Sequence, residues 1–195
     1  MTKLLTSLFI LAIAGFLLVP PVADALPNGA VGYKVYHLEG SDWVRYRLGD
    51  EFPAGGATPP TNVWKYEYSV MNYGYATGVY QFMIFFNSDN ILRATYSSSV
   101  APTGWSYTYM PAAPGYYNWK VRFRTTQAMY YVMAPDTLPG YGVQFTWNDE
   151  AMLPGAQNYD LVAQTGSESG VTHELPPEMT PIEPSTWGAI KSLFR

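Results

Sequence analysis

The chain has 195 residues, of which 48% are hydrophobic and 13% charged, and it contains no cysteine. This length suits one domain with a substantial core, and the hydrophobic share excludes an intrinsically disordered protein. The net charge of −4 argues against nucleic-acid binding, which requires a surplus of basic residues. The aromatic share of 16% favours strands over helices.

The N-terminal segment has the pattern of a secretory signal peptide, which we expect at residues 1–25. Lys3 provides the positive charge, Leu4–Val19 is apolar, and Ala23-Asp24-Ala25 has the small-x-small form of a cleavage site. An uncleaved anchor is the alternative, but the apolar stretch has 16 residues, fewer than the roughly 20 that a membrane span needs. We therefore expect a secreted mature chain that begins at Leu26 and has no membrane span.

Alternating aromatic and polar residues predict short strands from Tyr33 to Gln164. Tyr33–Leu38 and Trp43–Leu48 are expected to pair as a hairpin. Val79–Phe86 is apolar on both faces except at Gln81, which is typical of a central strand. The other alternating segments are 64–70, 105–109, 117–124, 141–147 and 159–163. The pattern predicts an all-β, antiparallel sandwich of about eight to ten strands at residues 26–165.

Proline and glycine divide the rest of the chain. Pro-Gly pairs at 114–115, 139–140 and 154–155 are expected at strand boundaries, and residues 53–60 are expected to form a loop or linker. Residues 166–184 are polar, acidic and proline-rich, which predicts an extended linker. Residues 185–195 are expected to form a short C-terminal helix with an apolar face, although eleven residues make only a marginal helix alone.

Five segments, taken together, resemble a known type of module, and the resemblance covers about half of the chain. They are Trp64–Asn72 (WKYEYSVMN), Val79–Phe86 (VYQFMIFF), Ala101–Ser106 (APTGWS), the segment around Trp119, and Leu138–Phe145 (LPGYGVQF). In this order they resemble an Ig-like β-sandwich module of secreted bacterial proteins. The resemblance implies a structural or adhesive role.

The C-terminal segment Pro184–Arg195 (PSTWGAIKSLFR) carries a second resemblance. It is similar to short tails that follow proline-rich linkers on exported bacterial proteins. This implies a sorting or anchoring signal at Trp187, Gly188, Lys191 and Arg195, although the tail lacks the membrane span of known C-terminal sorting signals. A helix docked on the sandwich is the alternative.

Residue types that perform catalysis are scarce in this sequence. His37 and His173 are the two histidines, neither is accompanied by a nucleophile motif, and thiol chemistry is excluded. Glu67 and Asp160 lie in predicted strands and would suit glycoside hydrolysis only if they faced each other across a cleft. We expect a protein that is not an enzyme and has no cofactor.

Metal-binding patterns are equally weak. The sequence has no HExxH motif, no paired Cys/His ligands and no EF-hand loop. Asn87–Asn90 and Asp149-Glu150 are oxygen-rich and would suit Ca²⁺ if they met in space, but these residue types also form turns. We therefore predict no metal site.

Aromatic and cationic side chains are the best candidates for a binding surface. Adjacent tyrosines such as Tyr116-Tyr117 and Tyr130-Tyr131 point to opposite strand faces, which leaves Tyr116 and Tyr130 as candidates for solvent exposure and sugar stacking. Lys120, Arg122 and Arg124 form a basic stripe on one strand face, which suits an acidic polysaccharide or another subunit. The alternative is that charges on an edge strand discourage aggregation.

These observations favour a non-catalytic extracellular or surface module with a structural or adhesive role. The absence of cysteine and of Asn-x-Ser/Thr acceptors fits a bacterial exported protein. Its partner would be a polysaccharide or another surface protein. A carbohydrate-binding module that uses exposed Tyr and Trp is the second hypothesis, and a secreted hydrolase is the third.

Overall fold

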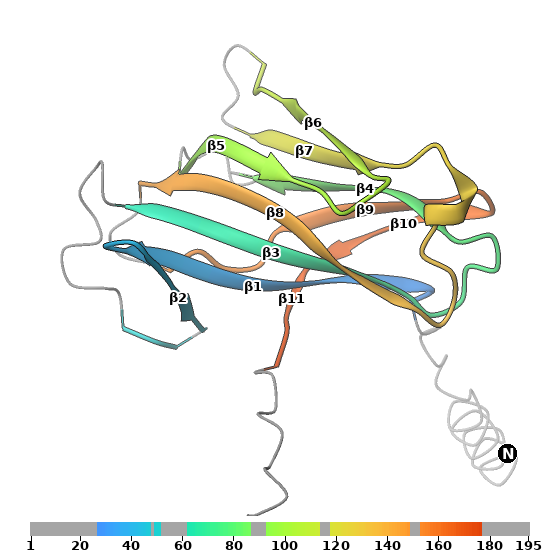
Figure 1. Ribbon diagram of the computed structural model, residues 1–195, viewed down its shortest axis with the longest axis horizontal. Coiled ribbons are helices and arrows are strands. Elements are labelled where there is room, and N and C mark those ends of the chain that lie inside the picture. Colours follow the sequence, from blue (N-terminus) through green and yellow to red (C-terminus); the bar gives the residue numbers. More distant parts are fainter. Residues whose placement is uncertain are drawn as a thin grey trace, which may run out of the picture.

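The computed structural model describes residues 27–47, 49–51, 62–86, 93–113, 118–148 and 153–176. These residues form a β-sandwich of two sheets that lie face to face (Figure 1). One short 3₁₀ turn at Ala128–Tyr130 interrupts the pattern of strands and loops.

The first sheet has six strands. Its order is β11-β1-β3-β8-β5, and β2 also pairs with β1. The bounds are β1 (Gly29–Glu39), β2 (Asp42–Tyr46), β3 (Val63–Asn72), β5 (Ala94–Val100), β8 (Thr137–Trp147) and β11 (His173–Glu174). The neighbours pair antiparallel except that β11 runs parallel to β1.

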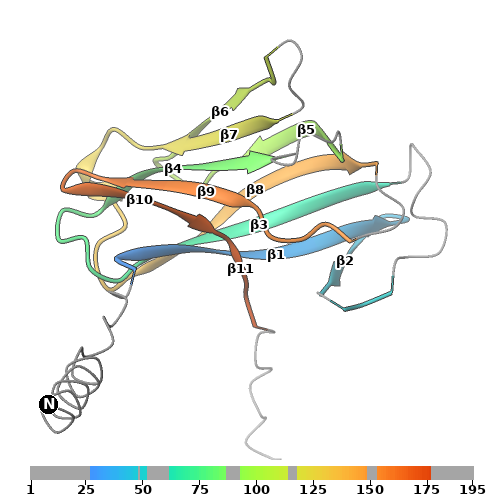
Figure 2. The ribbon, with the colours of Figure 1, turned by 180° about the vertical axis from the view of Figure 1, so that it is seen from behind.

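The second sheet has five antiparallel strands in the order β10-β9-β4-β7-β6. The bounds are β4 (Val79–Phe86), β6 (Ser106–Met110), β7 (Trp119–Arg124), β9 (Asn158–Ala163) and β10 (Gly166–Val171). Figure 2 shows from behind how β9 and β10 continue this sheet across the face of β1 and β3. The edges of this sheet are therefore β10 and β6.

Aromatic rings fill the space between the sheets. Phe82 of β4 meets Tyr141 of β8 edge-on at 4.7 Å between ring centroids, and Phe86 lies 5.9 Å from Phe145. Trp119 stacks on Phe86 at 3.9 Å and donates a hydrogen bond to the carbonyl of Ala94 at 2.7 Å. Each of these side chains is buried. Large aromatic area removed from water is the main stabilising contribution in such a core.

Strand alternation in the sequence correctly predicts most of this core. The tyrosine and tryptophan of β3, the inward residues of β7 and those of β8 and β9 are buried where the pattern places them. The hairpin of β1 and β2 forms as expected, with Val35 opposite Tyr46. The prediction of an all-β, antiparallel sandwich is confirmed.

Several boundaries differ from the sequence-based expectation. The linker expected from residue 166 is instead strand in its first part, because Gly166–Val171 pairs with β9 as β10 and His173–Glu174 joins β1 as β11. Strand β5 was not expected, because its three serines and its irregular register against β8 hide the alternation. The described residues hold eleven strands rather than eight to ten.

Two other predictions fail locally. Pro139-Gly140 does not end a strand: it lies inside β8, where the register against β3 shifts and Gly140 adopts a φ of +98°. The alternation at 105–109 is typical of a half-buried strand, but Tyr107 and Tyr109 are 45% and 37% exposed, because β6 is an edge strand. Strand β4 is central as predicted, but its outward side chains are only half-buried.

Other expectations fall outside the described residues. They are the signal peptide at 1–25, the loop at 53–60, the oxygen-rich segments 87–90 and 149–150, Tyr116, the rest of the linker, and the tail helix with Trp187, Gly188, Lys191 and Arg195. These remain predictions from the sequence.

Candidate functional site

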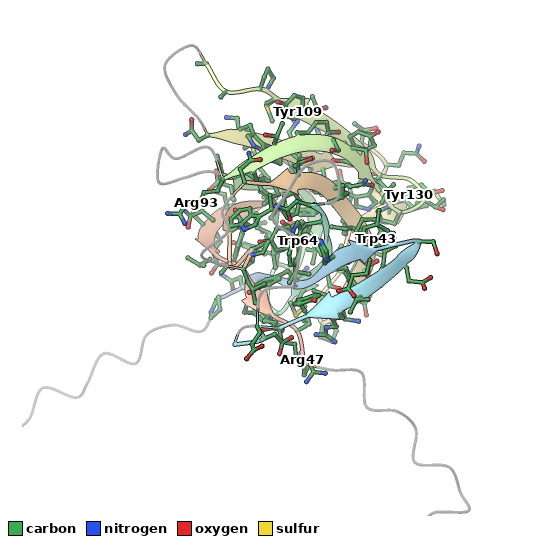
Figure 3. The ribbon with its side chains drawn as sticks, turned by 90° about the vertical axis from the view of Figure 1, so that its left-hand side faces the viewer. Trp43, Arg47, Trp64, Arg93, Tyr109 and Tyr130 are labelled. Carbon is green, nitrogen blue, oxygen red and sulfur yellow. The ribbon has the colours of Figure 1, made fainter. Side chains whose placement is uncertain are left out.

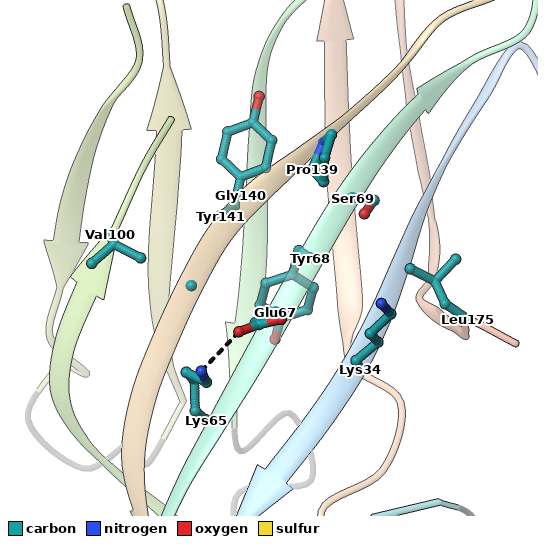
Figure 4. A pocket seen from close by; sticks show the side chains of 11 residues that line it. Lys34, Lys65, Glu67, Tyr68, Ser69, Val100, Pro139, Gly140, Tyr141 and Leu175 are labelled. Atoms are coloured by element: carbon teal, nitrogen blue, oxygen red, sulfur yellow. Dashed lines mark ion pairs between the residues drawn. The ribbon is translucent and has the colours of Figure 1, made fainter. Parts of the chain in front are cut away.

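The outer face of the six-stranded sheet carries a hollow of about 320 Å³ (Figure 4). Gly140 and Gly142 of β8 line it, together with Val100 of β5. Lys34, Lys65 and Glu67 line it from β1 and β3, and Leu175 closes one end. Its volume is at the lower end of the roughly 300–1,000 Å³ of small-molecule sites.

The charged groups of this hollow already have partners in the protein. The ammonium group of Lys65 lies 2.7 Å from Glu67 Oε1. It also lies over the rings of Tyr36 and Trp43, at 4.9 and 4.8 Å from their centroids. Because Lys65 has an anion and two aromatic faces around it, the cluster satisfies its own charge. It is a weak candidate for ligand binding.

The outer face of the five-stranded sheet carries the basic stripe predicted from the sequence. Lys120, Arg122 and Arg124 alternate on β7 with the buried Trp119, Val121 and Phe123, so all three point away from the core. Successive members of the stripe are about 6.8 Å apart, because antiparallel strands rise about 3.4 Å per residue. The stripe is therefore a row of three cations about 14 Å long.

The neighbours of the stripe on both adjacent strands are uncharged. Across β6 the register places Ser106, Thr108 and Met110 beside it, and across β4 it places Gln81, Met83 and Phe85 beside it. Lys120 lies over the ring of Phe85 at 5.7 Å. Within the described part of the chain, no ion pair joins the stripe to a carboxylate.

The one carboxylate of the described residues on this face is Asp160, on β9. It lies two strands from β7, at about 10 Å by the usual strand spacing, and accepts a hydrogen bond from Ser169 Oγ at 2.5 Å. That separation is close to the Debye length of about 8–10 Å, so solvent ions screen much of its effect on the stripe. The cations therefore remain available to an external anion.

The position of β7 removes the aggregation explanation for these charges. Charges protect a sheet from edge-to-edge pairing when they lie on an edge strand. Strand β7 is interior, between β4 and β6, whereas the edge strand β6 has no charged residue. Protection against edge-to-edge pairing therefore does not explain why these three cations lie on β7.

The exposed tyrosines do not form a flat platform for sugars. Tyr109 is labelled in Figure 3 near the top of the molecule. It stacks face to face on Tyr96 at 4.0 Å, so one face of its ring is already covered. Tyr107 lies on the same side of β6, beside Phe123 of the core. The coplanar row that a carbohydrate-binding surface requires is not found among the described rings. These tyrosines close the gap between the sheets at β5 and β6.

Tyr130 lies in the 3₁₀ turn rather than on a strand face. Its carbonyl accepts a hydrogen bond from Trp105 Nε1 at 3.0 Å, and its ring covers Gly104. A second hollow of about 290 Å³ lies here, lined by Trp105, Met129, Tyr130 and Leu138 among others. Tyr130 is thus partly buried by packing, and it lies in the 3₁₀ turn rather than on the strand face that carries the stripe.

The candidate catalytic groups are not brought together. Glu67 lies on the outer face of the six-stranded sheet and Asp160 on the outer face of the other, with the core between them. His37 is buried against Trp64 at 4.7 Å between ring centroids, and its Nδ1 lies 3.6 Å from Glu39. The proposed carboxylate pair is excluded by this geometry, and His37 has a packing role.

Sequence patterns found the stripe but not its surroundings. Met83 and Phe85 were expected to be covered, since β4 is apolar on both faces, yet they flank the stripe on an open face. The alternation in β4 places Met83 and Phe85 on the outward face, but the order of the strands decides what covers that face. Groups of acidic and histidine residues suited to a metal ion are not found among the described residues.

Comparison with known proteins identifies no relative of this chain. No protein-family model matches the chain, and no curated protein matches it. Within the described segments, no helix has the length and apolar character to cross a membrane.

Proposed function

We propose that this protein is an exported, non-catalytic bacterial module of Ig-like type that acts outside the cell or at its surface by adhering to an anionic polysaccharide. The leader pattern at residues 1–25 and the absence of cysteine support export. The scattered carboxylates and buried His37 support a role without catalysis. The tail at 185–195 suits a surface-sorting signal.

The observation that carries the binding proposal is the basic stripe on an interior strand. Lys120, Arg122 and Arg124 point to solvent from β7, between two uncharged strands, in a protein whose formal net charge is −4. A linear anionic chain can contact all three cations at once, because they lie in one row. Half-buried Met83 and Phe85 offer the apolar contact that the sugar rings of such a chain need.

The test is binding of the mature chain to immobilised polygalacturonate, with dextran as the neutral polysaccharide. We expect binding to polygalacturonate alone, and we expect it to weaken as salt is added, because salt screens exposed charges. Arg122→Gln should weaken binding about two- to fivefold, as for a single exposed ion pair. Replacing all three cations by glutamine should abolish it.

The matched control is Arg47→Gln, the same change at an exposed position that follows β2. It should leave the affinity unchanged, because Arg47 lies outside the five-stranded sheet. Equal binding to dextran, or full binding by the triple variant, would refute the proposal. Circular dichroism of each variant verifies that the sheet is intact.

A further inference from the structure

Strand β6 forms an open edge of the five-stranded sheet. It pairs with β7 on one side, and the strand order ends there. Figures 1 and 2 both show β6 as the outermost strand of its sheet. An edge strand has a row of backbone N–H and C=O groups that can pair with a further strand.

This edge lacks the features by which proteins usually protect a strand. Residues 106–110 read SYTYM, without charge or proline, and the register against β7 is regular. The opposite edge strand β10 contains Glu168, and β2 contains Asp42 and Arg45. Strand β5, on the same flank as β6, has an irregular register against β8. Among these edges, β6 is the most receptive to another strand.

The side chains of β6 favour a second copy of the same strand. The sequence is nearly symmetrical about Thr108, with a tyrosine on each side. An antiparallel pair centred on Thr108 would place each Thr108 opposite the other, and each Tyr107 opposite a Tyr109 of the second copy. Both tyrosines are on the inner side of the strand and partly exposed, at 45% and 37%. Cross-strand aromatic pairs stabilise antiparallel pairing.

We propose that two copies of this chain associate through β6, antiparallel and with Thr108 on the two-fold axis. The two five-stranded sheets then form one continuous sheet of ten strands. Such an interface is self-complementary, as in most symmetrical dimers. Since β6 has only five residues, we expect a reversible equilibrium that depends on concentration.

The basic stripes do not oppose this pairing. Three strand spacings separate one β7 from the other across the joint, which is about 14 Å. This exceeds the Debye length of about 8 Å at physiological ionic strength, so repulsion between the stripes is screened. The pairing would also place both stripes on one side of the continuous sheet.

Disulfide trapping with Thr108→Cys tests the register directly. The chain has no other cysteine, so a disulfide can form only between two copies. Residues directly opposite in an antiparallel pair have Cα atoms about 4.5–5.5 Å apart, within the range that a disulfide spans. Under a mild thiol oxidant, we expect rapid formation of a covalent dimer.

Ser167→Cys is the matched control, since Ser167 is an exposed position on β10 at the other edge of the same sheet. It should cross-link only at the slower rate of random collision. Equal rates for the two variants would overturn the proposal.

A second variant measures the equilibrium without cross-linking. Thr108→Lys places two like charges opposite each other, so we expect a monomer by analytical ultracentrifugation, while Thr108→Val retains the dimer. A wild-type chain that stays monomeric up to its solubility limit would overturn the proposal, and the edge would then be open to a strand of another protein. A dimer that survives Thr108→Lys would equally refute the role of β6.

Discussion

Several buried polar side chains of this sandwich are hydrogen-bonded inside the core. Trp64 Nε1 donates to Asn62 Oδ1 at 2.5 Å, and Asn72 Nδ2 donates to the carbonyls of Tyr75 and Val132 at 2.9 and 2.7 Å. Buried polar groups cost free energy unless they are hydrogen-bonded. These contacts therefore fix the positions of Trp64 and Asn72 in the core. The hydroxyl groups of Tyr68 and Tyr141 are buried without a partner among the described residues.

Trp119→Ala should lower the free energy of unfolding by about 3–5 kcal/mol, the usual cost of truncating a large buried ring. The change removes the stack on Phe86 and the hydrogen bond to the carbonyl of Ala94. Urea denaturation measures the loss. Met129→Ala is the control, because Met129 is 79% exposed and should have little effect. Similar stability of the two variants would contradict the described core.

Whole elements show where the sequence could and could not predict the structure. Strand β7 was correctly predicted because every second residue from Trp119 to Phe123 is apolar. Strand β10 was missed because its sequence, GSESGV, has no apolar alternation and owes its form to pairing with β9. Glycines are favourable here, since a side chain at Gly170 would collide with the ring of Tyr159. Pairing with the neighbouring strand β9 overrides the weak local preference of this sequence.

Ending the chain at Thr165 should therefore prevent stable folding. This truncation removes the six paired positions of β10 and the buried Thr172, whose hydroxyl accepts a hydrogen bond from Gln157 N at 2.9 Å. At about 0.5–1.5 kcal/mol for each lost hydrogen bond, the cost approaches the usual total stability of about 5–15 kcal/mol.

The control for this truncation is a chain that ends at Pro176 and keeps β10 and β11. We expect it to fold, and differential scanning calorimetry distinguishes the two chains. A cooperative transition of equal temperature in the chain that ends at Thr165 would show that β10 is dispensable, as the sequence-based linker prediction implied.

At the scale of the molecule, the two faces of the sandwich differ in a way that periodicity alone could not predict. Alternation indicates which side chains of a strand point inward, and it correctly placed Lys120, Arg122 and Arg124 outside. It cannot indicate that β7 is interior and β6 an edge, because strand order depends on contacts between distant segments. The candidate site was thus predicted as a set of residues but not as a surface.

The tyrosine content makes the fold sensitive to alkaline pH. Burial raises the pKa of Tyr66, Tyr68 and Tyr141, and the pKa values of Tyr33, Tyr75 and Tyr159 are raised by burial and by nearby acidic or tyrosine side chains. Burial, followed by the hydrogen bond to Glu39 and nearby negative charge, raises the pKa of Tyr46 to about 12.

These shifts have a defined effect on stability. A tyrosine with a raised pKa in the folded state ionises first in the unfolded chain, so its stabilising contribution is complete below about pH 10 and is lost above that value. We expect the melting temperature to fall steeply between about pH 10 and pH 12. Thermal melts followed with tyrosinate absorbance check this. Full ionisation of the tyrosines at pH 10 with the fold intact would contradict this expectation.

The parallel pair of β1 and β11 determines how the sandwich bears a mechanical load. These are the first and last strands of the described chain, and they pair at Gly32 with His173 and at Tyr33 with Glu174. Because they run in the same direction, tension between residues 27 and 176 slides one strand along the other rather than peeling it away. Sliding stretches the connecting bonds together, including that from Leu175 N to the carbonyl of Tyr33. A molecule held at both ends would thus resist extension through the short parallel pairing of β1 and β11.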